Sequence, residues 1–137
     1  MKKYLIAVVV LLLVVTGCGN SKKLTCTLEK DGSKDELVMT YKKDELVKVV
    51  ATSVIYSDEE VDKDDLALYE EFTCSLLGDK EYIDCSIEAK GKNVEITITM
   101  DLENLTEEEL EEMGYTKENS SYEEMKKSAE EDKYICK

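Results

Sequence analysis

The chain has 137 residues, with 18 basic and 32 acidic side chains and a formal net charge of −14. This acidic balance argues against nucleic-acid binding, which needs a basic footprint. His and Arg are absent, which excludes Ser-His-Asp and Cys-His nucleophile systems, imidazole metal sites and bidentate arginine clamps. We therefore predict no catalytic residue and no cofactor, and a protein that is not an enzyme. An enzyme built from Lys, Tyr and carboxylates is the weakest alternative.

The N-terminus has the pattern of an export signal. Two lysines precede an apolar run of 12 residues from Tyr4 to Val15, well short of the ~20 that a membrane-spanning helix needs. A basic start, a short apolar middle and small residues at the end predict a secretory signal peptide. The segment Val15-Thr16-Gly17-Cys18 resembles the bacterial lipobox, whose cysteine thiol accepts a diacylglyceryl group.

These features predict three parts. We expect residues 1–17 to be a cleaved lipoprotein signal peptide, and residues 18–23 to be the lipidated Cys18 and a short tether. Residues 24–137 should form a single domain on the extracytoplasmic face of the cell membrane. Without Lys2 and Lys3, the mature chain has 16 lysines against the 32 acidic residues, a net charge of −16. We expect a monomer that lipid holds near the membrane without adsorption to anionic headgroups.

Three strands are predicted first in the domain. LTCTLEK (24–30), ELVMTYK (36–42) and ELVKVVATSVIY (45–56) have the apolar spacing of half-buried strands. Asp31-Gly32 and Lys43-Asp44 mark the turns between them, the second a tight hairpin.

A helix within about residues 59–77 comes next. Ser57-Asp58-Glu59-Glu60 offers a capping box, and Gly78 is a natural C-cap. Between them, apolar residues recur at helical spacing: Leu68, Tyr69, Phe72 and Leu76. In the acidic run 58–65, Asp62 and Asp64 match the first two ligands of an EF-hand loop, but Leu66 stands where the third should be. We therefore predict an acid-rich helix start and no metal site.

The rest of the chain predicts a hairpin and two helices. YIDCSIEAK (82–90) and VEITITMDL (94–102) alternate strictly, with a turn at Gly91. Capping boxes at Thr106 and Ser121 begin helices that end at Gly114 and at about Lys133. The order βββ-α-ββ-α-α predicts an α+β fold, an antiparallel sheet of about five strands with helices packed on one face.

The remaining four cysteines predict two disulfides in an exported protein, with three possible pairings. Cys74 lies near the end of the first predicted helix and Cys85 in the strand that follows. A bridge between them would pin that helix to the sheet and leave Cys26 to pair with Cys136. The other two pairings stay open on this reasoning.

Several segments resemble the YehR-like family of small bacterial lipoproteins. The likeness covers nearly the whole mature chain and is most specific at LTCT, at NLTEEELEEMG and at the terminal YICK. The family has no established activity, so the resemblance implies fold and location and carries over no catalytic position. It also implies the pairs Cys26–Cys136 and Cys74–Cys85.

The expected function is that of a lipid-anchored binding or accessory module, with an unknown protein or small ligand as its partner. The alternative is a structural envelope protein whose acidic surface binds cations or wall components collectively.

Overall fold

The computed structural model describes residues 21–137. The predicted signal peptide and Cys18 lie outside the described residues. The elements, in chain order, are β1 (Ser21–Lys30), β2 (Ser33–Lys42), β3 (Glu45–Tyr56), α2 (Lys63–Phe72), the 3₁₀ helix η1 (Ser75–Leu77), β4 (Ile83–Lys90), β5 (Asn93–Asp101), α3 (Glu107–Glu112), α4 (Tyr122–Glu131) and β6 (Ile135–Cys136).

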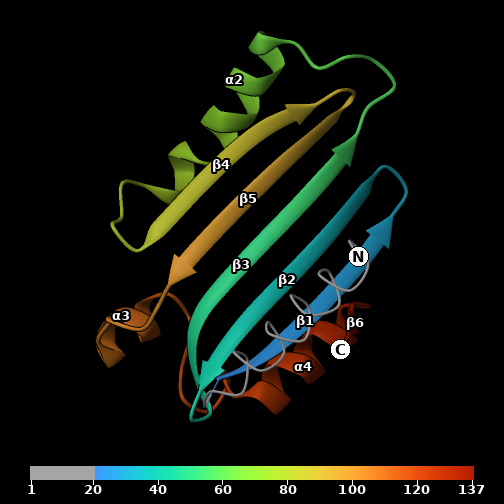
Figure 1. Ribbon diagram of the computed structural model, residues 1–137. Coiled ribbons are helices and arrows are strands. Elements are labelled where there is room, and N and C mark those ends of the chain that lie inside the picture. The colour runs from blue at the N-terminus through green and yellow to red at the C-terminus, as the bar shows by residue number, and fades with distance from the viewer. Residues whose placement is uncertain (1–20) are drawn as a thin grey trace, which may run out of the picture.

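The strands form one antiparallel sheet in the order β4-β5-β3-β2-β1-β6, with α2 beside β4 and α4 beside β1 and β6 (Figure 1). The predicted α+β class is confirmed, with six strands rather than about five. The additional strand, β6, has only two residues, which pair with Cys26 and Thr27 of β1. A segment that short shows no alternation, so its sequence carried no strand signal.

The β2–β3 connection is a tight hairpin, as its sequence predicted. Lys43 and Asp44 have φ angles of 50° and 62°. Two successive positive φ values are typical of a type I′ turn, whose twist matches that of the flanking strands. Residues with a Cβ are strained there, and Asn-Gly is the preferred sequence.

The predicted tether needs a correction. Strand β1 begins at Ser21, and Ser21, Lys22 and Lys23 pair with residues 42 to 40 of β2. Strand β1 starts earlier than predicted because it pairs with β2 along the full length of β2. The ammonium of Lys22 also lies 3.7 Å from the centre of the Tyr122 ring on α4, a cation–π contact. Residues 21–23 are therefore part of the sheet, and only Gly19 and Asn20 separate Cys18 from it.

Helix α2 and η1 lie within the predicted range 59–77, but the predicted capping box at Ser57 was wrong. Helix α2 begins after Asp62, whose carboxylate accepts hydrogen bonds from the backbone N–H groups of Asp64 and Asp65 at 2.8 and 2.9 Å. Asp65 completes the capping box. Ser57 does not cap the helix. Its backbone N–H donates to the carbonyl of Lys92 in the β4–β5 turn. The acidic run is a connection and a helix start.

The main core lies where α3 and α4 cover the β1–β3 side of the sheet. Its buried members come from β1, β2, β3, α4 and the loop after β5: Leu24, Cys26, Met39, Tyr41, Leu46, Val49, Leu102 and Ala129. Leu110 and Met113 from the α3 region and Met125 from α4 pack against them. Burying side chains of this size stabilises a fold by roughly 1.5–3 kcal/mol each.

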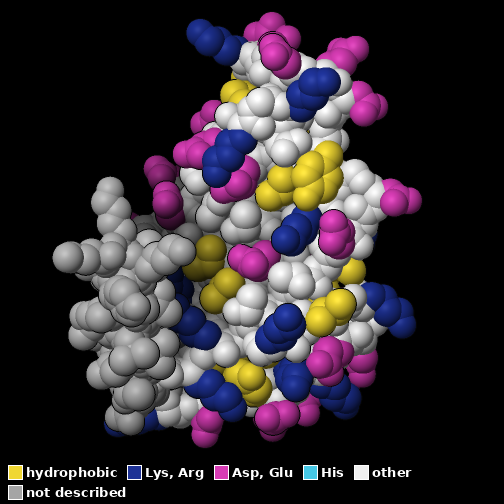
Figure 2. Space-filling model, turned by 45° about the vertical axis from the view of Figure 1, so that its right-hand side comes forward, with side chains coloured by type: hydrophobic (Ala, Val, Ile, Leu, Met, Phe, Trp, Pro, Cys, Tyr) yellow, Lys and Arg dark blue, Asp and Glu magenta, His cyan; other side chains and the backbone are white. Residues whose placement is uncertain are grey.

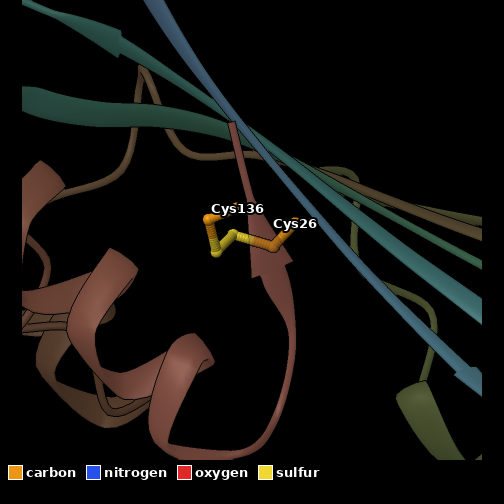
Figure 3. Close-up of a disulfide and its surroundings, with 2 residues drawn as sticks. All are labelled: Cys26 and Cys136. Carbon is orange, nitrogen blue, oxygen red and sulfur yellow. A yellow bond between two sulfur atoms is a disulfide. The ribbon is translucent and has the colours of Figure 1, made fainter.

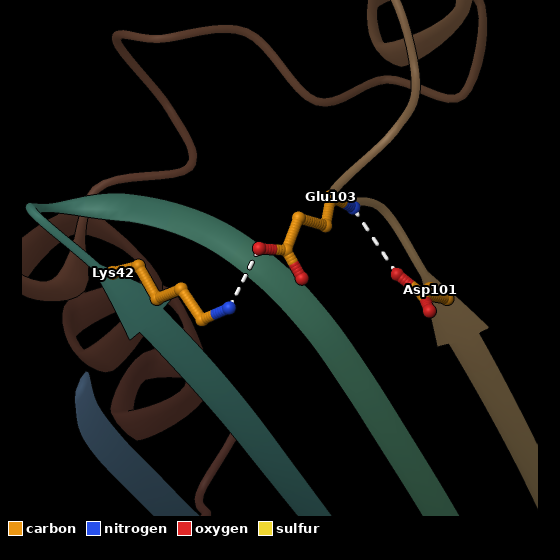
Figure 4. Close-up of polar contacts among 3 residues, drawn as sticks. All are labelled: Lys42, Asp101 and Glu103. Carbon is orange, nitrogen blue, oxygen red and sulfur yellow. Dashed lines mark hydrogen bonds and ion pairs between the residues drawn. The ribbon is translucent and has the colours of Figure 1, made fainter. Parts of the chain in front are cut away.

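A polar contact fixes the loop that leaves β5 for α3 (Figure 4). The ammonium of Lys42, at the end of β2, lies 2.6 Å from a carboxylate oxygen of Glu103. The Glu103 N–H donates to the Asp101 carboxylate at 3.2 Å. Both members of the ion pair are about half exposed, so its contribution to stability is about 1 kcal/mol or less.

Candidate ligand groove on the helix-bearing face

One row of residues crosses the whole sheet and has a disulfide at each end. Neighbours along the row are register partners: Cys85, Ile98, Ala51, Leu37, Cys26 and Cys136. Because directly opposed residues point to the same side of a sheet, all six side chains lie on one face. At about 4.8 Å per strand, the row is roughly 24 Å wide.

The disulfide at one end of this row joins the sheet to the helical layer, and the disulfide at the other end joins two neighbouring strands. Cys85 bonds to Cys74, just after α2, and Cys26 bonds to Cys136 in β6, just after α4 (Figure 3). This is the pairing that the sequence favoured. Cys85 points to this face and bonds to the segment after α2, and Ala129 of α4 packs in the core with Leu24 and Cys26 of β1. Helices α2 and α4 therefore stand on this face at opposite edges of the sheet. Between them lies a groove, the sheet groove, whose floor is the middle of the row.

The floor of the sheet groove is mainly apolar. A hollow of about 190 Å³ is lined by Leu37, Ala51, Ile96 and Ile98. Ligand pockets for whole small molecules usually measure about 300–1,000 Å³. The hollow therefore suits a few side chains of a larger partner better than a complete cofactor.

A polar group lies at one side of the floor. The hydroxyl of Ser53 donates to the carboxylate of Asp35 at 2.6 Å, and Tyr134 also lines the hollow. Burial raises the pKa of the Tyr134 phenol, and the nearby carboxylates of Asp35 and Asp132 raise it further. The Tyr134 hydroxyl therefore stays a hydrogen-bond donor at neutral pH.

Helix α2 turns an apolar stripe outward. Its sheet-facing residues Leu66 and Tyr69 are half-buried, and no residue of α2 is fully buried. By contrast, Leu68 and Phe72 of α2 and Leu76 of η1 are 53%, 65% and 78% exposed. We call these three the rim stripe. They are three of the four residues whose spacing predicted the helix, and they contribute little to packing within the described chain.

The helix beside β4 is strongly acidic. Helix α2 and its cap residue contain one lysine, Lys63, and five carboxylates: Asp62, Asp64, Asp65, Glu70 and Glu71. None of these carboxylates takes part in the ion pairs found within residues 21–137. Helix α4 carries both signs of charge, with Lys126 and Lys127 ahead of Glu130, Glu131 and Asp132.

The opposite face of the sheet has a different character. Thr25, Thr40, Thr97 and Thr99 alternate with the groove-side residues of their strands and so point away from the described helices. Val38, Val50 and Val54 lie on the same face, so this surface mixes threonine and valine. It provides matched control positions for the groove.

A second hollow, of about 350 Å³, lies between the α3–α4 loop and α4, beside Tyr115, Asn119 and Met125. It is also lined by Glu124, Lys127, Ser128 and Glu131, and Asn119 serves the loop. The Asn119 side chain accepts from the Thr116 N–H at 2.7 Å and donates to the Gly114 carbonyl at 3.0 Å. These two hydrogen bonds hold the α3–α4 loop against the start of α4.

Tyr41 is the most unusual titratable group in the core. Its ring meets that of Tyr122 edge-on at 5.6 Å, and its buried hydroxyl has no hydrogen-bond partner among residues 21–137. Burial, with smaller effects from Tyr115 and Tyr122, raises the pKa of Tyr41 to about 12. The phenol is therefore neutral throughout the physiological range.

Within residues 21–137, no three or more Cys, Asp or Glu residues are grouped in a way that could hold a metal ion. None of the helices in the same range has the length and apolar character needed to cross a membrane. Figure 2 shows lysine and acidic side chains spread over one side of the molecule, with hydrophobic side chains in small separate groups.

No protein-family model and no curated protein matches the chain. Among solved structures, the chain is similar to one described as "NMR structure of the protein from Streptococcus pneumoniae TIGR4". The two share 16% sequence identity with a TM-score of 0.55, over 88% of this chain and 87% of that one. At this identity the likeness shows the fold alone.

Proposed function

We propose that this protein is a lipid-anchored module outside the cell membrane that binds a partner protein through the sheet groove. Lipid on Cys18 would hold the domain at the membrane, and the groove would receive side chains of the partner. The module brings together a partner and a membrane surface and performs no chemistry of its own.

The anchoring part rests on the sequence before the described residues. The lipobox-like segment ending at Cys18 follows a short apolar run after two lysines. Cys18 and Ser21 are three residues apart, so their Cα atoms are at most about 11 Å apart. A lipid-anchored domain would therefore be held close to the headgroups. The disulfides support export, because such bonds persist in oxidising compartments.

The single observation that carries the binding part is the cross-strand row with a disulfide at each end. Two covalent links hold α2 and β6 at opposite edges of an apolar floor, so the groove keeps its shape when it is empty. A preformed groove loses less conformational entropy on binding. The rim stripe adds exposed apolar surface, which on soluble proteins often marks an interaction site.

The experiment is chemical crosslinking in living cells followed by capture of the full-length protein. We expect a partner with the native chain, and loss of that partner when Leu68→Ser and Phe72→Ser are combined. Ile135→Ser is the matched control, because Ile135 is 68% exposed and its backbone position places it on the opposite face. Capture that is equal for the rim variant and the native chain would contradict binding through the groove.

The anchor is tested separately in the same cells. Cys18→Ser should release the protein from the membrane fraction or leave it unprocessed. Unchanged lipid labelling of the Cys18→Ser protein would contradict anchoring through this residue, while leaving the groove to be judged on the crosslinking result.

A further inference from the structure

We propose that the protein forms a two-fold dimer through the outer edge of β4, so that the sheets of two copies join into one. This inference goes beyond the proposed function, because the outer edge of β4 is no part of the floor of the sheet groove. It also departs from the monomer expected from the sequence.

The edge formed by β4 is long and regular. Strand β4 is the outermost strand on one side of the sheet (Figure 1). It has eight residues and pairs with β5 over its whole length without a register shift, and the chain has no proline. The opposite edge differs, because β6 has only two residues and a disulfide ties it to β1. A long, unbroken edge strand is a template for pairing with another strand, and folded proteins usually shorten, bend or cover such edges.

Three residues of β4 turn their backbone hydrogen-bonding groups away from β5. The Asp101 N–H donates to the Tyr82 carbonyl, which fixes the alternation of the β4–β5 ladder. Alternate residues from Tyr82 onward therefore face β5 with their backbone groups, whereas Cys85, Ile87 and Ala89 face outward. The N–H and C=O groups of these three have no hydrogen-bond partner among residues 21–137. Such a row of groups is complementary to one extended backbone.

A second copy of β4 fits this edge in one register. When two β4 strands pair antiparallel about Ile87, the outward groups of Cys85 meet those of Ala89 in the second copy, and Ile87 meets its own copy. All the outward groups of both copies are then paired. On the face opposite the described helices, Asp84 of each copy stands across from Lys90 of the other. Residues opposed in this way have Cα atoms about 4.5 Å apart, so the carboxylate and the ammonium can pair.

Like charges disfavour the neighbouring registers. Moving the two-fold axis by one residue places Asp84 opposite Glu88 in one direction, and Glu88 opposite its own copy in the other. Like charges directly opposite one another destabilise a strand pair. The ammonium of Lys90 also lies 3.0 Å from the carboxylate of Glu95 within the chain, and its three N–H donors can serve both carboxylates.

The groove side of the same register has room for the disulfide. Cys85 bonds to Cys74 on that face. In the register about Ile87, the residue opposite Cys85 is Ala89, whose side chain is a single methyl group. The bridge therefore meets the smallest side chain with a Cβ that a second strand can present.

The lipid anchor proposed above would favour this pairing. An interface of one strand from each copy is small, and interfaces of that kind are weak. Anchoring confines both copies to one surface and raises their effective concentration. The two-fold axis of an antiparallel strand pair is perpendicular to the sheet. With this axis along the membrane normal, Ser21 of both copies would lie at the same height, so that one membrane holds both anchors.

The test uses the full-length protein purified from membranes in an uncharged detergent, with micelles in large excess over protein. Sedimentation velocity measures the fraction of dimer as the protein concentration is raised. Ala89→Pro removes one outward N–H, keeps the β4–β5 hydrogen bonds and is compatible with an edge strand. We expect this variant to dimerise at least tenfold more weakly than the native chain. The control, Ala89→Ser, keeps the N–H and should change the dimer affinity less than twofold.

Charge reversal tests the register without altering the backbone. Asp84→Lys would oppose two lysines and Lys90→Asp two aspartates, so each variant alone should dimerise about fivefold more weakly. An equal mixture of the two variants restores both opposite-charge pairs across the interface. We expect the mixed dimer to recover to within twofold of the native affinity. The control mixture combines Lys90→Asp with Asp79→Lys, which lies before β4, and should not recover.

The possible failures are distinguishable. A protein that stays monomeric at every concentration would overturn the inference, as would equal dimerisation of Ala89→Pro and Ala89→Ser. Mixed charge variants that fail to recover would refute the two-fold register. A purified monomer whose captured partner in cells is lost on Ala89→Pro would assign the edge to a strand of another protein.

The sheet groove is judged separately, by capture of a partner with the native chain and its loss in the rim variant. Dimers that are lost only when Leu68→Ser and Phe72→Ser are combined would place the second copy on α2, and would overturn pairing through β4. Dimers that persist in the rim variant and are lost on Ala89→Pro would support it, whatever the groove binds.

Discussion

Removing the Cys74–Cys85 disulfide should release α2 and leave the sheet folded. Helix α2 has ten residues and none is fully buried. An isolated helix of that length is marginal in water, so its packing on β4 and the covalent link through Cys74 must hold it in place. We expect Cys74→Ala with Cys85→Ala to convert α2 from a fixed wall of the groove into a fluctuating segment.

The magnitude follows from the loop that the bond closes. The two cysteines are 11 residues apart, for which the chain-entropy model gives about 3 kcal/mol. This is the upper limit for the loss of global stability. The loss of stability should be a larger fraction of the local stability of α2. Without the disulfide, α2 has few contacts that oppose its local unfolding.

Hydrogen exchange measured by mass spectrometry separates these two effects. In the double variant, we expect peptides from Lys63–Phe72 to exchange nearly as fast as an unfolded chain, while β3 and β5 stay protected. The native protein is the reference. Protection of α2 that equals the protection of β4 in the variant would refute the reasoning, because it would show that noncovalent packing alone holds the helix.

Three further predictions concern stability. Cys26→Ala with Cys136→Ala should lower the free energy of unfolding by about 5 kcal/mol in urea titrations, because the sequence separation is 110; a loss no greater than that from the α2 bridge would contradict this. The pKa of Tyr41 is raised to about 12 in the folded protein, so above pH 10 the Tyr41 phenol loses its proton in the unfolded chain before it does so in the folded one. The free energy of unfolding should therefore fall by up to about 3 kcal/mol between pH 10 and 12. Tyr41→Phe should reduce that fall, and an identical pH profile would argue against the assignment. Lys43→Asn with Asp44→Gly should raise the melting temperature by relieving two positive φ angles, adding about 1 kcal/mol; no gain would mean that the turn is unstrained.

Much of the fold was predictable because its local signals are strong. The alternation in β5 and the tight turn at Lys43-Asp44 each specify a local structure with little dependence on the rest of the chain. The capping box at Thr106 likewise predicted where α3 begins. These signals were sufficient for the α+β class and for five of the six strands.

The cap of α2 was assigned to the wrong residue because two capping signals compete within nine residues. Ser57 and Asp62 are both favourable cap residues, and the contacts of Ser57 and Asp58 with Lys92 decide between them. Lys92 belongs to a turn 35 residues beyond Ser57, so no local pattern contains that information. The same holds for β6, whose pairing depends on a disulfide to β1.

The groove was beyond prediction for a related reason. Its floor depends on the register of four strand pairs, which places Ile98, Ala51 and Leu37 in line between two cysteines. Each strand's pattern predicts which residues share a face but not which residue stands opposite which. The sequence did contain one hint. Helix α2 packs on the sheet through Leu66 and Tyr69. Leu68 and Phe72 are additional apolar residues that this packing does not use.

The central claim is that the helix-bearing face of the sheet binds the partner, and site-directed photocrosslinking in living cells tests it most directly. A photoreactive phenylalanine replaces Ile98, which lines the groove, or its neighbour Thr97, which points to the opposite face of the same strand. We predict a crosslinked partner from position 98 and none from position 97. Crosslinks from position 97 alone would contradict the account, because they would place the binding surface on the opposite face of the sheet.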